Sequence, residues 1–103
     1  MTRIHFHESF YKAIQDGKKI QTARIDEPHY PLGNAVADFS DGSSLPIKIL
    51  AISHKKINNM SLHDIQNDGF QSKGELWEAL IGFYPNLKED DELMLVEFSC
   101  IKE

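Results

Sequence analysis

The stretch Gly17-Lys-Lys-Ile-Gln-Thr-Ala-Arg24 is the most informative part of this sequence. Gly17 is suited to the stop at the C-terminus of a helix, and residues 18–25 are a candidate strand. In a regular strand Thr22 and Arg24 point to the same face, whereas Lys19 points to the opposite face. Lys19 can therefore join the other two only if it lies in the turn after Gly17 or if a bulge intervenes.

The residues on either side of this stretch predict a strand, a short helix and a loop. Residues 3–7 alternate apolar and polar side chains, which is the period of a half-buried strand. Phe10, Ala13 and Ile14 have the i, i+3, i+4 spacing of one helix face. Residues 26–34 hold two prolines and a Gly-Asn pair, which predicts an irregular loop.

Three further strands are expected downstream. Residues 35–39 and 45–57 are rich in apolar side chains, and the Asp-Gly-Ser-Ser sequence at 41–44 predicts a hairpin turn between them. Residues 93–101 form a last apolar stretch with strand character. The sequence therefore ends on a strand that follows an acidic loop.

Two helices are expected between these strands. Ser61 and Ser72 each stand three residues before a carboxylate, which is the capping pattern of a helix N-terminus, and Pro85 marks the end of the second helix. Helices and strands do not alternate regularly, which argues against a doubly wound parallel sheet. We expect an α+β fold, a small, mostly antiparallel β-barrel with short helices at its ends.

The composition is that of one globular domain. Hydrophobic residues make up 41% and charged residues 26% of the 103 residues. No stretch approaches the ~20 apolar residues of a membrane helix, and the N-terminus has no secretory signal. We therefore expect a cytoplasmic protein without a membrane partner. The single cysteine, Cys100, forms no internal disulfide and is expected to be a small buried apolar residue.

The charge is acidic overall but unevenly distributed. The formal net charge is −5, which argues against binding of a DNA duplex. Residues 1–25, however, carry five lysine and arginine side chains against only Glu8 and Asp16. A basic patch on an acidic body would suit a small ligand or a short RNA segment. The oligomeric state is left open by the sequence.

The pattern at residues 17–24 resembles the ASCH family, a branch of the PUA-like superfamily. The family's Gly-x-Lys-x-x-x-x-Arg stretch is matched by Gly17, Lys19 and Arg24. The sequence is most similar to the small bacterial ASCH proteins that are N4-acetylcytidine amidohydrolases, whose Lys-x-x-Thr-x-Arg motif is matched through Thr22. Further similarities are His29-Tyr30, Tyr84-Pro85 and the closing strand. The resemblance implies a single PUA-like ASCH domain over residues 1–103.

The resemblance also implies roles for individual residues. Lys19 and Thr22 match two catalytic residues of the amidohydrolases, and their catalytic glutamate falls near Asp68, which is one methylene shorter. A family Gly-Asp pair is replaced here by Gly33-Asn34. Expected substrate-binding residues are Arg24, which would hold a substrate oxygen, Lys18, which adds positive charge, and His29 and Tyr30, which would stack on a base.

Several functions remain open at this point. The first is a metal-independent amidohydrolase that acts on a modified nucleoside such as N4-acetylcytidine, with a lysine whose pKa is lowered by burial or by nearby cations. The second is a non-catalytic RNA- or nucleotide-binding module, and a weaker third is a ribonuclease. The simplest alternative is that Lys18 and Lys19 are solvated and that Arg24 only pairs with Asp26 or Glu27.

No cofactor and no metal are expected. His5 and His7 lie on one strand face beside Glu8, but the sequence offers no obvious third ligand.

Overall fold

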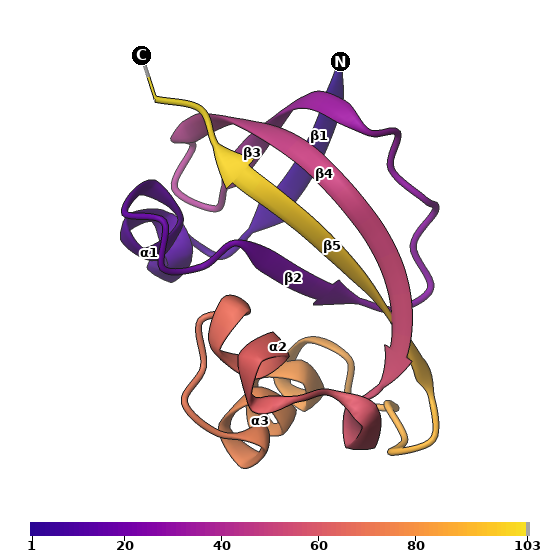
Figure 1. Cartoon of the computed structure of the whole chain (residues 1–103). Coiled ribbons are helices and arrows are strands. Elements are labelled where there is room, and N and C mark those ends of the chain that lie inside the picture. The colour runs from indigo at the N-terminus through magenta and orange to yellow at the C-terminus, as the bar shows by residue number, and fades with distance from the viewer. Residues whose placement is uncertain (103) are drawn as a thin grey trace.

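The computed structural model describes residues 1–102 and contains five strands and three short α-helices (Figure 1). The strands are β1 (Thr2–Phe6), β2 (Gln21–Arg24), β3 (Gly33–Phe39), β4 (Ser44–Lys56) and β5 (Glu92–Cys100). The helices are α1 (Tyr11–Gln15), α2 (Leu62–Asn67) and α3 (Lys73–Phe83), with 3₁₀ turns at Glu8–Phe10 and Ile57–Asn59.

The strands form one curled sheet in the order β1-β3-β4-β5-β2. Three of its four strand pairs are antiparallel, and β1 pairs with β3 in parallel. The expected α+β fold with short helices is therefore confirmed. Within residues 1–102 the barrel is only half formed, because β1 and β2 are the two edges of the sheet and do not pair with each other. Figure 1 shows the long strands β4 and β5 curving between these edges.

The core consists of two clusters that meet at β5. One cluster lies against β1, β3 and α1 and receives Met94, Val96 and Phe98 from β5. The other lies against α2 and α3 and receives Leu93 and Leu95. Successive side chains of a strand point to opposite faces, so the continuous apolar run of β5 supplies both clusters.

The turn between α1 and β2 is longer than the sequence predicts. The N–H groups of Lys18 and Lys19 both donate to the carbonyl of Ala13 at the end of α1, and the N–H of Ile20 donates to Asn67 at the end of α2. The N–H groups of residues 18–20 are therefore used by the two helices, although the Ile20 carbonyl accepts from the N–H of Phe98 on β5, and β2 begins only at Gln21. Lys19 lies outside β2, so its side chain does not have to point to the face opposite Thr22 and Arg24.

The predicted helix boundaries are confirmed. Ser61 and Asp64 form a reciprocal capping box at the start of α2, and the Ser72 hydroxyl accepts from the N–H of Glu75 at the start of α3. Gly17 follows α1 with a φ of 75°, a conformation that L-residues adopt only at a cost. None of the helices in residues 1–102 has the length and apolar character needed to cross a membrane.

Two glycine replacements test the importance of the turn before Lys19. Gly17→Ala should lower the free energy of unfolding by about 1 kcal/mol, because alanine is strained at positive φ although a methyl group would meet no other atom. Gly74→Ala, in the first turn of α3, should instead raise it by about 0.5 kcal/mol through helix propensity. Urea denaturation measures both. Equal effects of the two replacements would show that the backbone at Gly17 is unstrained.

Candidate functional site

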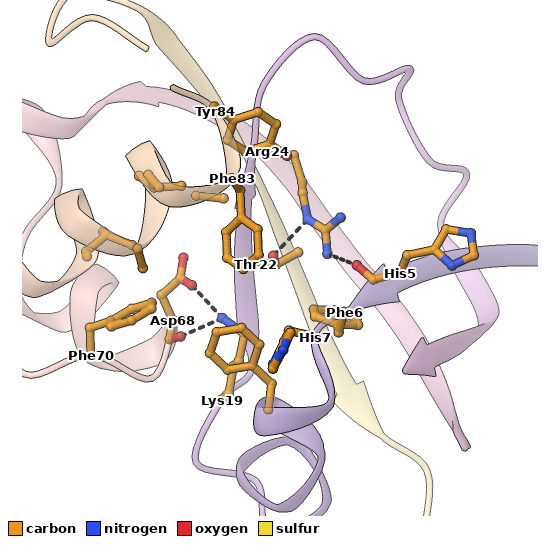
Figure 2. Close-up of a pocket in the computed structure, with 15 residues that line it drawn as sticks. His5, Phe6, His7, Lys19, Thr22, Arg24, Asp68, Phe70, Phe83 and Tyr84 are labelled. Atoms are coloured by element: carbon orange, nitrogen blue, oxygen red, sulfur yellow. Dashed lines mark hydrogen bonds and ion pairs between the residues drawn. The ribbon is translucent and has the colours of Figure 1, made fainter. Parts of the chain in front are cut away.

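A cavity of about 290 Å³ opens where the sheet fails to close. Its walls come from β1, β2, the turn after α1, the segment that joins α2 to α3, and the last turns of α3. Figure 2 shows the side chains of Lys19, Thr22 and Arg24, with the ring of Phe83 among them and the ring of Phe70 beside Asp68. The half-open barrel thus provides a concave site lined by both polar and apolar groups.

The floor of the cavity contains a buried ion pair between Lys19 and Asp68. The Lys19 ammonium donates both to a carboxylate oxygen and to the main-chain carbonyl of Asp68, each at 2.6 Å, and both side chains are 3% exposed. The rings of Phe10 and Phe70 lie 4.7 and 5.5 Å from the Lys19 nitrogen. Asp68 is the C-terminal cap of α2, so the ends of α1 and α2 meet at this pair.

Burial shifts both members of the pair toward their neutral forms. Desolvation lowers the pKa of Lys19 below the ordinary value, although the Asp68 carboxylate partly opposes this shift. Desolvation likewise raises the pKa of Asp68, against the opposing charge of Lys19. A lysine of this kind gives up its proton more readily than a solvated one, which is the requirement for a general base or a nucleophile.

One oxygen of Asp68 has no protein partner. Oδ2 is buried and accepts no hydrogen bond from any described residue, whereas Oδ1 accepts from Lys19. Buried carboxylate oxygens are nearly always hydrogen-bonded, so Asp68 Oδ2 is an exception among the buried polar atoms of residues 1–102.

Thr22 and Arg24 lie side by side on β2, as their parity predicts. The Arg24 Nε donates to the Thr22 hydroxyl oxygen at 3.0 Å, and its Nη2 donates to the main-chain carbonyl of His5 at 2.6 Å. The guanidinium also stacks over the Phe6 ring at 4.9 Å. Arg24 thus links β2 to β1 across the opening of the sheet, at the position where a strand pair would otherwise form.

Glu27, which does not line the cavity, extends this network to Tyr84, which does. The Glu27 carboxylate lies 3.6 Å from Arg24 Nη1 and accepts hydrogen bonds from the hydroxyls of Tyr30 and Tyr84. The simple alternative named Glu27 as a partner of Arg24, and that pairing is present. The same alternative expects Lys18 and Lys19 to be solvated. Lys18 is exposed, but the expectation is wrong for Lys19, which is buried and paired with Asp68.

The sequence matches no protein-family model and no curated protein. Solved structures do match. The ASCH domain from Lactobacillus crispatus JV V101 superposes with a TM-score of 0.74 and 19% identity, covering 96% of this chain and 78% of that one. A mutant form of the ZmASCH protein from Zymomonas mobilis gives a TM-score of 0.68 and 18% identity, covering 97% of this chain and 71% of that one.

The chain has the ASCH fold. A third structure, the hypothetical protein PH0355, agrees in extent, with a TM-score of 0.74 and 20% identity over 96% of this chain and 97% of its own. The predicted resemblance is therefore confirmed at the level of the fold. Sequence identities this low support a shared fold, but they do not show that this chain has the activity of any of these proteins.

The ASCH fold brings together some of the predicted site residues and leaves out others. Lys19, Thr22, Arg24 and Asp68 all line the cavity. Lys18, His29 and Tyr30 do not line it. The Lys18 side chain is exposed, and the Tyr30 hydroxyl is directed to Glu27.

Four of the five histidines lie in two places. His5 and His7 line the cavity, whereas His29 contacts His54 on β4, with 3.0 Å between their Nε2 atoms. No group of three or more His, Cys, Asp and Glu side chains in residues 1–102 is arranged to hold a metal ion.

The expected basic patch is largely neutralised in the folded chain. Four of the five basic side chains in residues 1–25 lie within 4 Å of a carboxylate, and only Lys18 does not. The pairs are Arg3–Asp38, Lys12–Asp16, Lys19–Asp68 and Arg24–Glu27. Three of the four carboxylate partners lie outside residues 1–25, so the charge count over that segment does not include them.

A double-mutant cycle tests whether the buried pair stabilises the fold. Lys19→Met and Asp68→Leu should each lower the free energy of unfolding by ~3 kcal/mol, because each leaves an uncompensated group in the core. The double variant should recover most of this loss, since two apolar side chains of similar size replace the pair. Urea denaturation of the four proteins measures the coupling. Additive losses would show that the two groups act independently.

Proposed function

We propose that this chain is a metal-independent amidohydrolase that removes the acyl group from a modified nucleoside such as N4-acetylcytidine. The proposal rests chiefly on one observation. A buried lysine amine whose pKa is lowered lines the same cavity as a threonine hydroxyl that is already hydrogen-bonded to an arginine. These groups supply a base, a nucleophile or water-positioning hydroxyl, and a fixed positive charge, which are the parts that amide hydrolysis requires.

The base is Lys19 in its neutral form. A neutral amine has two N–H bonds and one lone pair, and Asp68 offers two acceptors at 2.6 Å, its carbonyl and Oδ1. With both N–H bonds donated to Asp68, the lone pair is left to take a proton from a group in the cavity. Asp68 thus orients the amine, and its raised pKa allows it to hold the proton that Lys19 releases.

Thr22 provides the hydroxyl on which this base acts. Its oxygen accepts from Arg24 Nε, so a positive charge already lies next to the atom that would become negative. Deprotonated Thr22, or a water that it positions, adds to the amide carbonyl of the substrate, and Lys19 holds the proton that is released. The guanidinium of Arg24 is then the nearest fixed cation for the oxyanion that develops, a role for which arginine is suited because it stays protonated. Collapse of the tetrahedral adduct breaks the C–N bond, and the departing amine takes this proton from Lys19. If Thr22 is the nucleophile, a water then hydrolyses the acyl-threonine ester and releases the carboxylate.

The size and charge of the cavity favour a neutral nucleoside. Its volume of about 290 Å³ lies near the lower end of the range for ligand pockets, which is roughly 300–1,000 Å³. Both of its cations, Lys19 and Arg24, are already paired with carboxylates. A phosphate would therefore find no uncompensated lysine or arginine inside, whereas a planar base would meet the rings of Phe70 and Phe83.

A non-catalytic nucleotide- or RNA-binding module is the second candidate. It is favoured by the close contact between Lys19 and Asp68, because an ammonium held at 2.6 Å from a carboxylate is stabilised in its protonated state. If the proton stays on Lys19, the cavity binds a base without cleaving it. Asp68, in the place of the longer glutamate of the amidohydrolases, is compatible with this alternative.

The decisive experiment is incubation of the protein with N4-acetylcytidine and detection of cytidine by chromatography. Thr22→Val keeps the shape of the side chain and should lower kcat/KM by about 100-fold or more, and Lys19→Met should have at least this effect. Lys12→Met, which removes an exposed lysine of α1, is the matched control and should retain activity. A Thr22→Val enzyme with wild-type kinetics would remove Thr22 from the mechanism.

The pH dependence follows from the direction of the Lys19 shift. Activity requires the neutral amine, so kcat/KM should fall as the pH is lowered through the Lys19 pKa, and the midpoint of this fall should lie below 10.5, the ordinary lysine value. No cytidine at any pH would reject the amidohydrolase. Binding of short RNAs that weakens with salt would then support the second candidate.

A further inference from the structure

Glu27 lies at the start of the loop that follows β2, where the chain reverses direction. The preceding residue, Asp26, has a φ of 56°, which only a few non-glycine residues adopt readily. This turn brings the Glu27 carboxylate back over the end of β2, and its side chain is only 25% exposed. A half-buried carboxylate next to a cavity needs several partners to offset the loss of water.

The carboxylate has a partner for each of its oxygens. The Tyr30 hydroxyl donates to Oε1 at 2.5 Å, and the Tyr84 hydroxyl donates to Oε2 at 2.8 Å. Arg24 Nη1 lies 3.6 Å from the same Oε2. Tyr30 comes from the loop and Tyr84 is the C-terminal cap of α3, so one carboxylate joins the loop, the helix and β2.

These contacts keep Glu27 charged. Burial alone would raise its pKa, but the hydrogen bonds from Tyr30 and Tyr84 and the charge of Arg24 together lower the pKa below the ordinary value. Burial and the neighbouring carboxylate raise the pKa of Tyr30 to about 12, so its hydroxyl remains a donor at neutral pH. An ionised Glu27 is therefore present next to Arg24 at neutral pH.

Arg24 is held at three points by this arrangement. Its Nη1 faces Glu27, its Nη2 donates to the His5 carbonyl, and its Nε donates to the Thr22 oxygen. Because a guanidinium is planar and rigid, three anchors on its three nitrogens fix its orientation. The Thr22 oxygen accepts from Arg24 Nε, so the Thr22 proton points away from the guanidinium. Thr22 and Lys19 line the same cavity.

We infer that Glu27 is a positioning residue of this site. It holds Arg24 in the orientation that turns the Thr22 proton away from the guanidinium and toward the base, and Tyr30 and Tyr84 hold Glu27 in turn. Glu27 itself touches no substrate, because it does not line the cavity. This inference rests on the proposed function for its effect on catalysis, but the orientation of Arg24 can be measured without any reaction.

Glu27→Gln tests the inference with little change in shape, because it keeps an acceptor for a tyrosine and removes the charge beside Arg24. With N4-acetylcytidine as substrate, kcat should fall about tenfold or more, whereas KM should change less than about twofold. Glu78→Gln, an exposed residue of α3, removes the same charge elsewhere and should leave both constants unchanged. Wild-type kcat in Glu27→Gln would overturn the inference.

The second readout is the Arg24 Nε–H resonance in a proton–nitrogen correlation spectrum. In the wild type this proton should exchange slowly with water, because it is donated to Thr22, and in Glu27→Gln it should exchange at least about tenfold faster. If it is unchanged while the free energy of unfolding falls, Glu27 only attaches the loop to α3 and the inference is wrong. An inactive wild type would reject the proposed function, and this resonance would still decide the role of Glu27.

Discussion

The ion pair between Lys19 and Asp68 is the constraint around which the rest of the structure is arranged. Removing two charges from water costs several kcal/mol per ion, and their mutual attraction offsets this only when the geometry is good. Here the geometry is set by two helix ends, since Lys19 follows the stop of α1 and Asp68 caps α2. The hydrogen bond from Ile20 to Asn67 fastens these ends together one residue away on each side.

The open side of the half-barrel is the second determinant of the site. A closed barrel of this size would fill its interior with side chains, but the separation of β1 from β2 leaves room for a ligand. Arg24 connects the two strands through the His5 carbonyl without closing the gap. The same guanidinium contacts Thr22 and faces Glu27, so the group that bridges the sheet is also the one that organises the polar wall of the cavity.

The sequence predicts those parts of the structure that depend on residues close together in the chain. Capping serines, the glycine after α1 and strand periodicity locate the elements, and strand parity places Thr22 with Arg24. The position of Lys19 was limited to a turn or a bulge, and the structure shows the turn. Asp68 was found through family resemblance, because no local pattern connects residues 49 positions apart.

The parts that the sequence did not predict depend on contacts between distant segments. The partners of Arg3 and Lys19 come from β3 and from the end of α2, so a charge count over residues 1–25 indicated a basic patch that the fold neutralises. The position of Glu27 depends on the positive φ of Asp26 and on Tyr84, 57 residues away. The sequence predicts that His29 and Tyr30 bind the substrate, but neither lines the cavity, and they contact His54 and Glu27 instead.

The unpaired edges of the sheet have a consequence for aggregation. An exposed edge strand offers free N–H and carbonyl groups to which another chain can add a strand. In this chain the two edges face each other across the cavity, β2 has only four residues, and Arg24 occupies the His5 carbonyl on β1. The side chains that shape the ligand site therefore also shield the edges, and replacements at Arg24 are expected to expose both at once.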